Sequence, residues 1–194
     1  MTKREIATAA TREKLINTAE NILQKNGYEK MSVADIAKTS GVAKGTFYNY
    51  FEKKEDIIFE LNKRHMDDLS DQIDDLAKEP AENSIRLYLT NFLQIVVNSK
   101  VNMARQWVRF VASSSNQDKW QYDNKLLQKL FKGLITNQKL KPSIPIDDIS
   151  LLLITEVYGI IFSWCISPTT IDPVTSMNKF CDIQLNSLLE PYFI

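Results

Sequence analysis

The sequence is poor in the residues that interrupt secondary structure, with five glycines and six prolines among 194 residues. So few breakers argue against a fold of many short strands joined by tight turns. Apolar residues recur three or four positions apart along almost the whole chain, and no internal repeat or low-complexity run is present. The sequence therefore predicts an all-α protein.

Histidine is scarcer still. The only one, His65, falls on a predicted apolar helical stripe, where packing is the commoner role. One histidine cannot build the usual zinc sites or catalytic triads unaided, and neither a glycine-rich phosphate loop nor an HExxH motif occurs. We therefore expect a protein that is not an enzyme and that carries no cofactor and no metal.

The two cysteines, Cys165 and Cys181, both fall in apolar helical segments. No signal peptide is evident at the N-terminus. This combination indicates reduced, buried thiols in a cytoplasmic protein, with a redox sensor as the less favoured alternative.

Charge is balanced overall but unevenly distributed. Residues 1–54 hold ten Lys/Arg against six Asp/Glu, and residues 55–194 hold fourteen against eighteen. A modest basic surplus at one end favours a specific, salt-dependent contact with DNA over general coating of nucleic acid. The apolar content of 44% is enough for one sizeable core, or for a core and a small satellite domain.

The stretch SVADIAKTSGVAKGTFYNYF, residues 32–51, predicts two short helices joined by a tight turn. Ser32 and Asp35 have capping-box spacing at the start of the first helix. Gly41 falls where the chain must turn sharply, and the second helix is expected to begin near Ala43. This helix-turn-helix arrangement fits the major groove of DNA.

The second helix of the motif presents two faces. Phe47 and Phe51 are four residues apart and should face the core. The residues expected to contact DNA are Ser32, Lys44, Gly45, Thr46, Tyr48, Asn49 and Tyr50. Lysine pairs with guanine or phosphate, a threonine methyl meets thymine, and tyrosine hydroxyls donate to phosphates. A glycine within a helix costs about 1 kcal/mol relative to alanine, so Gly45 indicates either close approach of bare backbone to a partner or a tolerated small residue.

A longer helix is predicted from Lys54 to about Lys78. Its inward stripe comprises Ile58, Leu61, His65, Leu69, Ile73 and Leu76. At 1.5 Å per residue the helix is roughly 37 Å long, enough to belong to two parts of the molecule. Lys54 at its start could hold a phosphate beside the helix N-terminus, or could belong to a solvated charge cluster.

A family resemblance follows from these motifs. The segment TREKLINTAENILQKNGYEKMSVADIAKTSGVAKGTFYNYFEKKEDIIFEL, about residues 11–61, resembles the N-terminal domain of the TetR family of bacterial transcriptional regulators. Its marks are NGY after a first helix of about Thr11 to Lys25, the helix-turn-helix stretch, and KKEDI after it. The resemblance implies a three-helix DNA-binding domain over residues 1–54, with Lys54 as a phosphate contact. A long helix would join it to a helical ligand-binding and dimerisation domain over residues 55–194, for which no subfamily is matched.

Two features of the N-terminal region remain open. Gly27 is expected to end the first helix. The segment before that helix, with Lys3, Arg4 and Arg12, is interpreted either as an arm that reaches a minor groove or as a frayed terminus.

Five further helices are predicted beyond residue 80. Their expected ranges are Ala81 to Lys100, Val101 to Ser114, Asp118 to Leu140, Ile146 to Ile166 and Pro173 to Leu189. The fourth is apolar nearly all round and needs cover on every side. Glu156 near its middle and the missing flanking Lys/Arg argue against a membrane span. We instead predict that it packs with the last helix into a four-helix homodimer interface, as the family resemblance also implies.

The middle helices carry residues that could line a small-molecule pocket. Candidate ligand contacts are Phe92, Met103, Trp107, Phe110, Trp120 and Glu156, and Arg105 and Arg109 are further polar anchors. The alternative is that the aromatic residues form plain core and that the arginines extend to water.

We therefore expect a ligand-responsive transcriptional regulator, most simply a repressor. It would bind a near-palindromic double-stranded operator as a dimer and be released by a small, largely apolar or cationic effector. An activator is a variant of this hypothesis. The alternative is a DNA-binding architectural or partner-recruiting protein of the same fold without a small-molecule inducer.

Overall fold

The computed structural model of the chain describes residues 2–113 and 118–194, except for the side chains of six residues: Lys3, Asn62, His65, Phe110, Ser113 and Asp118. Every regular element within the described ranges is helical, which confirms the all-α prediction. The chain divides into two compact units, Met1–Arg64 and His65–Ile194. The division falls within the long helix α4 (Lys54–Leu76), so α4 contributes residues to both units.

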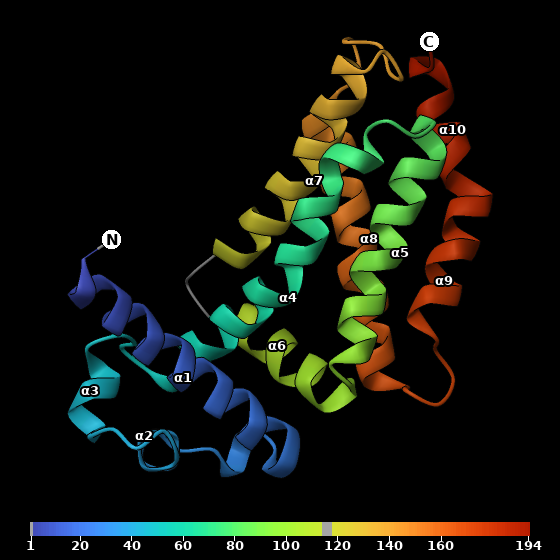
Figure 1. The fold of residues 1–194 in the computed structure, drawn as a ribbon. Coiled ribbons are helices and arrows are strands. Elements are labelled where there is room, and N and C mark those ends of the chain that lie inside the picture. Colours follow the sequence, from blue (N-terminus) through green and yellow to red (C-terminus); the bar gives the residue numbers. More distant parts are fainter. Residues whose placement is uncertain (1, 114–117) are drawn as a thin grey trace. The chain divides into compact units, whose positions relative to one another are not determined.

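The first unit contains α1 (Lys3–Asn26), the 3-10 turn η1 (Tyr28–Lys30), α2 (Val33–Thr39), α3 (Lys44–Tyr48) and the start of α4 (Figure 1). Helix α1 contacts α2, and α2 contacts α3. The inward positions of α1 predicted from its spacing, Leu15, Ile16, Ala19 and Leu23, are buried. Gly27 ends α1, as predicted, with a φ of +77°, a backbone conformation that glycine adopts more readily than other residues.

Helix α1 begins eight residues before the predicted start at Thr11. Thr2 is its N-cap: the Thr2 hydroxyl accepts from the Glu5 N–H at 3.3 Å, and the Thr2 N–H donates to the Glu5 carboxylate at 2.7 Å. This capping box satisfies two backbone groups and extends the helix to Lys3. The segment that was interpreted as an arm or a frayed terminus is therefore helical.

The second unit contains the rest of α4 with α5 (Ala81–Asn98), α6 (Val101–Ser113), α7 (Asp118–Thr136), α8 (Ile146–Ile166) and α9 (Pro173–Phe180). Figure 1 shows α5, α8 and α9 running alongside one another. Helix α8 also contacts α6 and α7. The core of this unit therefore forms around α8, whose inward residues include Leu153, Ile154, Val157 and Ile161.

Helix α5 ends two residues before the predicted Lys100, and the predicted end of the next helix at Ser114 lies outside the described residues. Two larger differences follow. Helix α7 ends at Thr136, four residues before the predicted Leu140, because Gln138 adopts a φ of +56° and turns the chain. The last helix is interrupted after α9 by a π-helical turn, η2 (Cys181–Leu185), before α10 (Asn186–Leu189). Apolar residues keep helical spacing beyond Thr136 and through the π-helical turn. The spacing therefore could not predict the early end of α7 or the interruption of the last helix.

The end of the chain is attached to the loop between α7 and α8. Leu140 and Phe193 form an isolated antiparallel bridge, and the Lys141 N–H donates to the Tyr192 carbonyl at 2.8 Å. The Lys141 ammonium also donates to the Pro191 carbonyl at 3.0 Å. These bonds close the second unit at one end of its helices.

Candidate DNA-binding and effector sites

The turn between α2 and α3 is built from local hydrogen bonds. Ser32 is the N-cap of α2, and its hydroxyl accepts from the Asp35 N–H at 3.1 Å. Gly41 carries the chain out of α2 with a φ of +66°, and the Val42 N–H donates to the Ala37 carbonyl at 3.0 Å. Ala43 is then the N-cap of α3, so the predicted helix-turn-helix is confirmed at each junction.

Helix α3 presents a buried and an exposed face, as predicted. Phe47 is fully buried and packs against Phe51, whose ring centroid lies 5.5 Å away. Tyr48 is 50% exposed, and its ring meets the edge of Phe47 at 5.4 Å. The other residues predicted to face outward, Lys44, Gly45 and Asn49, are exposed, and Thr46 and Tyr50 are half-buried at the edge of this face. A rigid aromatic anchor therefore holds a short polar surface toward solvent.

Gly45 lies in open surroundings. A Cβ added at this position would meet no heavy atom within 4 Å. Packing inside the protein therefore does not require a glycine here. Both interpretations of Gly45, close approach of an external surface to the backbone and a tolerated small residue, are compatible with these surroundings.

Ser32 and Lys54 also have intramolecular partners. The exposed Ser32 hydroxyl donates to the Asp35 carboxylate at 2.6 Å in addition to capping α2. The Lys54 ammonium donates to the Met31 carbonyl at 3.3 Å and lies 4.0 Å from the centroid of the Tyr28 ring. These contacts fix Lys54 at the start of α4 and use only one of its three donors, so a phosphate oxygen could still accept from it.

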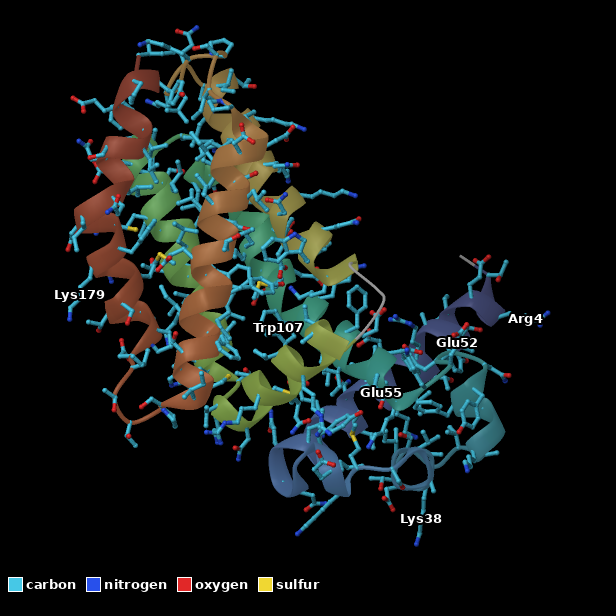
Figure 2. The ribbon with its side chains drawn as sticks, turned by 180° about the vertical axis from the view of Figure 1, so that it is seen from behind. Arg4, Lys38, Glu52, Glu55, Trp107 and Lys179 are labelled. Atoms are coloured by element: carbon cyan, nitrogen blue, oxygen red, sulfur yellow. The ribbon has the colours of Figure 1, made fainter. Side chains whose placement is uncertain are left out.

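Exposed lysines extend the basic character of this unit. Lys38 projects away from α2 in Figure 2 and is exposed, as are Lys44 and Lys53. The Lys53 N–H donates to the Asp56 carboxylate at 3.0 Å, which caps the start of α4 from within the chain. The exposed ammonium groups of Lys38, Lys44 and Lys53 therefore supply positive charge on α2, on α3 and just before α4.

The predicted ligand contacts fall in the second unit, where several of them meet. Phe92 of α5 is fully buried, and Trp107 of α6, labelled in Figure 2, is nearly so. The ring centroids of Trp107 and Trp120 each lie 4.8 Å from that of Tyr158 on α8. Residues from α5, α6, α7 and α8 thus form one aromatic cluster.

The centre of this cluster is a buried ion pair that the sequence did not single out. Lys119 is 3% exposed and Asp123 is fully buried, and the Lys119 ammonium donates to the Asp123 carboxylate. The Tyr158 hydroxyl donates to the same carboxylate at 2.9 Å. Burial raises the pKa of Asp123 and lowers the pKa of Lys119, and the charge of each partner opposes these shifts. The signal available in the sequence was an i,i+4 charge pair within the aromatic run KWQYD.

The other residues predicted to contact a ligand are not among the rings and charges described above. Met103 of α6 and Glu156 of α8 are half-buried. The Arg105 guanidinium donates to the Cys165 carbonyl at 2.9 Å, so it joins α6 to the end of α8. Arg109 is exposed, and the side chain of Phe110 lies outside the described residues.

Both cysteines are buried and free, as predicted. Burial raises the pKa of Cys165, and it raises the pKa of Cys181 to about 11. Thiols in this state are poor nucleophiles, which favours a packing role.

Helix α8 is only partly covered within the second unit. Its exposed apolar residues are Leu151, Leu152, Phe162 and Ile166, and Ile183 of η2 is 70% exposed. By length and composition α8 is also the one helix in the described part of the chain that could cross a membrane, with half of its apolar window buried. A core helix of a globular protein meets the same criteria, so this is weak evidence for a span.

Comparison with known proteins agrees with this geometry. Residues 15–61 match the family described as "Bacterial regulatory proteins, tetR family". The chain is 39% identical over 75 residues to the fatty acid metabolism regulator protein of Bacillus subtilis, a match that spans 39% of each chain. It is 22% identical over 195 residues to the probable HTH-type transcriptional regulator ArpR of Pseudomonas putida, covering 92% of this chain and 91% of ArpR.

The fold is also shared with a solved structure. Thermus thermophilus FadR, a TetR-family transcriptional repressor in complex with lauroyl-CoA, superposes with a TM-score of 0.77 at 15% identity, covering 92% of this chain and 95% of FadR. These similar proteins are transcriptional regulators and not enzymes. The matched segment of residues 15–61 therefore identifies the first unit as the DNA-binding domain of a TetR-family bacterial regulatory protein, on a chain whose helical fold is that of a solved TetR-family regulator.

Proposed function

We propose that the protein is a ligand-responsive repressor that binds a near-palindromic operator as a homodimer and is released by a small, largely apolar or cationic molecule. It would act in the cytoplasm. The observation that carries the DNA-binding part is the outward face of α3, where Lys44, Gly45 and Tyr48 are exposed on a helix anchored by the buried Phe47.

The chemistry of this face suits a DNA duplex. Lys44 supplies a cation for a guanine or a phosphate, and Asn49 and Tyr48 supply hydrogen-bonding groups beside it. The half-buried Thr46 and Tyr50 border the same face, and Ser32 and Lys54 begin the helices that flank it. The exposed Gly45 would let a phosphate or a base edge approach the backbone of α3 closely.

A homodimer is supported by the uncovered apolar side of α8. Leu152, Phe162 and Ile166 are each more than half exposed on this helix, and Ile183 extends the patch onto η2. A second copy of the chain would cover these residues in a self-complementary interface. A two-fold dimer would present two α3 helices, so we expect a nearly palindromic operator with half-sites about one helical turn apart.

An effector site is supported by the aromatic cluster of the second unit. Rings from four helices surround a few buried polar groups, which is the usual composition of a small-molecule site. The Bacillus subtilis relative is named as a fatty acid metabolism regulator, and the Thermus thermophilus protein binds lauroyl-CoA. An effector with an apolar portion would suit the walls of the corresponding unit here.

Release from DNA would be a coupling between the two sites. The effector would favour a conformer whose paired α3 helices no longer match successive grooves. The continuous helix α4 contributes residues to both units and is the natural element to carry the change. Reciprocity then requires operator DNA to weaken effector binding by the same factor by which effector weakens operator binding.

An architectural or partner-recruiting protein without an inducer is the second candidate. The observation in its favour is that the aromatic cluster is already occupied by the ammonium of Lys119, so its polar groups are largely satisfied within the chain. A ligand would therefore have to displace part of the protein.

The DNA-binding proposal can be tested without knowledge of the operator. Duplexes bound by the purified protein would be selected from a random-sequence library, and the recovered sites sequenced and assayed by gel shift. We expect an inverted repeat bound by a dimer. Recovery of single, non-repeated half-sites bound by a monomer would contradict the dimeric reading, and absence of any sequence enrichment would favour the architectural candidate.

A further inference from the structure

The ammonium of Lys119 is held inside a cage of aromatic rings. It lies 5.8 Å from the ring centroids of Phe92 and Trp107 and 5.7 Å from that of Tyr122. These rings come from α5, α6 and α7, and the lysine side chain is 3% exposed. Several aromatic faces around one cation form the arrangement by which proteins recognise ammonium ligands.

A carboxylate completes the cage. Asp123 accepts from the Lys119 ammonium and from the Tyr158 hydroxyl, and it is fully buried. The hydroxyl of the fully buried Tyr88 has no hydrogen-bond partner among the described residues. Burial, and the negative charge of Asp123 after it, raise the pKa of Tyr88, so this hydroxyl lies within the field of the same carboxylate. The core of this unit therefore also holds a buried hydroxyl without a partner among the described residues, and the pKa of that hydroxyl responds to the charge of Asp123.

We propose that this cage is the effector site, that Lys119 occupies the place of the effector's positive charge, and that the effector is a lipophilic amine or quaternary ammonium compound. This inference rests on the proposed function and specifies its ligand. The cation of the effector takes the position of the Lys119 ammonium against Asp123, its apolar portion lies against Trp107 and Trp120, and Lys119 turns out toward solvent.

Charge balance selects a cation over an anion. Exchange of one ammonium for another leaves the buried carboxylate paired, and Lys119 regains its hydration. A carboxylate or phosphate ligand would instead bring a second negative charge beside Asp123, unless that group took up a proton. A cation is therefore the ligand that this site accepts with the least rearrangement of buried charge.

The position of Lys119 makes the exchange feasible. It lies in the first turn of α7, which begins at Asp118, and helix ends open at a lower free energy than helix interiors. Within the described part of the chain its hydrogen-bond partner is Asp123 on the same helix, so its departure breaks no described hydrogen bond between helices. The four-carbon stem can reach solvent by rotation about its own bonds.

The cage is also connected to α4. Burial and then the negative charge of Asp67 raise the pKa of Tyr122, and Asp67 belongs to the part of α4 in the second unit. A ligand that moves the Tyr122 side chain therefore changes its electrostatic interaction with a residue of α4. This interaction gives cage occupancy a route to the helix that continues toward α3.

The proposal is tested by direct binding to the full-length protein, with Trp107 and Trp120 as fluorescent reporters. Decyltrimethylammonium is compared with decanoate and decanol, which share its chain, and with lauroyl-CoA. We expect the cation to bind at least about tenfold more tightly than decanoate or decanol. Tighter binding of decanoate or lauroyl-CoA than of the cation would overturn the assignment while leaving a ligand-responsive repressor in place.

Two substitutions separate binding in the cage from binding elsewhere. Asp123→Asn keeps an acceptor for Tyr158 but removes the negative charge. We expect this substitution to weaken binding of the cation by about 30-fold or more. Lys119→Met removes the competing ammonium, and we expect tighter binding, by about tenfold, together with a larger rise in melting temperature on adding the cation. Equal cation affinity in wild type and Asp123→Asn would overturn the proposal, and this comparison decides it even if Lys119→Met fails to fold.

The proposed function itself fails by a different readout. If the cation binds in the cage but does not change affinity for the selected operator, the site assignment stands and ligand-responsive repression is wrong. Loss of operator binding on adding the cation to wild type, without that loss in Asp123→Asn, would support both.

Discussion

Gly133 of α7 lies directly against Ala77, the residue that follows α4: a Cβ on Gly133 would come within 2.8 Å of the Ala77 Cβ. The Asn137 side chain donates to the Ala77 carbonyl at 2.8 Å and holds the two segments at this separation. The Ala77 Cβ has no rotatable bond that could take it out of this contact. Replacing Gly133 with alanine must therefore move α7 away from the end of α4.

We expect Gly133→Ala to destabilise the protein by about 1–3 kcal/mol, the usual cost of overpacking a tight contact. The measurement is the free energy of unfolding from denaturant titration. Gly45→Ala is a matched control, because a Cβ there meets nothing within 4 Å and alanine favours the helix by up to about 1 kcal/mol. A Gly133→Ala variant as stable as wild type would show that the two segments can separate freely.

Gly45→Ala has a second use in the DNA-binding assay. We expect it to keep or raise stability while weakening operator affinity by about tenfold, because the added methyl group stands between α3 and the duplex. Fluorescence anisotropy with the selected operator would measure the change. Unchanged affinity would show that Gly45 is a tolerated small residue with no contact to DNA.

The exposed apolar side of α8 predicts sensitivity of the dimer to charge. We expect Leu152→Glu to convert a dimer to a monomer, because leucine at this position is 58% exposed in one chain and would be covered by the second. Sedimentation velocity would measure the assembly state. Leu87→Glu is the control, since Leu87 is also an exposed leucine but lies on α5. Dissociation by both variants or by neither would argue against an α8 interface.

The cap of α9 predicts a pH-dependent contribution to stability. The Asp172 carboxylate accepts from the Thr175 N–H at 2.7 Å, and hydrogen bonds from the Thr175 side chain and backbone hold the pKa of Asp172 below its ordinary value of 3.8. A lowered folded-state pKa means that the stabilisation is present above pH 3.8 and is lost as the pH falls through the folded-state value.

We therefore expect Asp172→Ala to cost about 1 kcal/mol at neutral pH and less as the pH is lowered below that range. Asp172→Asn should retain most of the cap, because its amide oxygen can accept the same bond. Unfolding titrations at several pH values would compare the three proteins. A cost for Asp172→Ala that stays constant down to pH 3 would contradict a role of the ionised carboxylate.

The buried ion pair predicts strong coupling between two substitutions. Lys119→Met leaves the Asp123 carboxylate without its cation, and loss of one partner of a buried pair costs about 3–5 kcal/mol. Lys119→Met with Asp123→Asn removes both charges and keeps an acceptor for Tyr158, so most of that loss should be recovered. A double-mutant cycle in the free energy of unfolding would measure the coupling, and additive effects would show that the pair does not interact.

The sequence was most informative where one local pattern determined the outcome. Helix α8 begins and ends at the predicted residues because prolines and a change of composition bound it, and the buried Phe47 with the exposed Tyr48 follows from helical spacing alone. Thr2 and Glu5 have the spacing of a capping box, which could have predicted the start of α1 at Lys3. The prediction began at Thr11 because the residues between Lys3 and Thr11 lack a strong apolar stripe.

The Lys119–Asp123 pair could not be recognised in the same way. An i,i+4 pair of opposite charge is typical of a solvated helix face. Its burial depends on Phe92, Trp107 and Tyr158, which come from three other helices far along the chain. Spacing within one helix cannot predict which rings will cover it.

Arg64 joins α4 to α1 through several partners at once. Its guanidinium donates to the Glu13 carboxylate at 2.5 Å and to the Asn17 side chain at 2.6 Å, and Arg12 pairs with Glu60 at 2.6 Å nearby. Each such exposed pair contributes only about 0–1 kcal/mol, but all of them are weakened by dissolved ions. We therefore expect rising ionic strength to loosen the scaffold that supports α3 and, at the proposed DNA interface, to screen the lysines of that scaffold from phosphate groups. The regulator should sense the salt content of its surroundings through both effects.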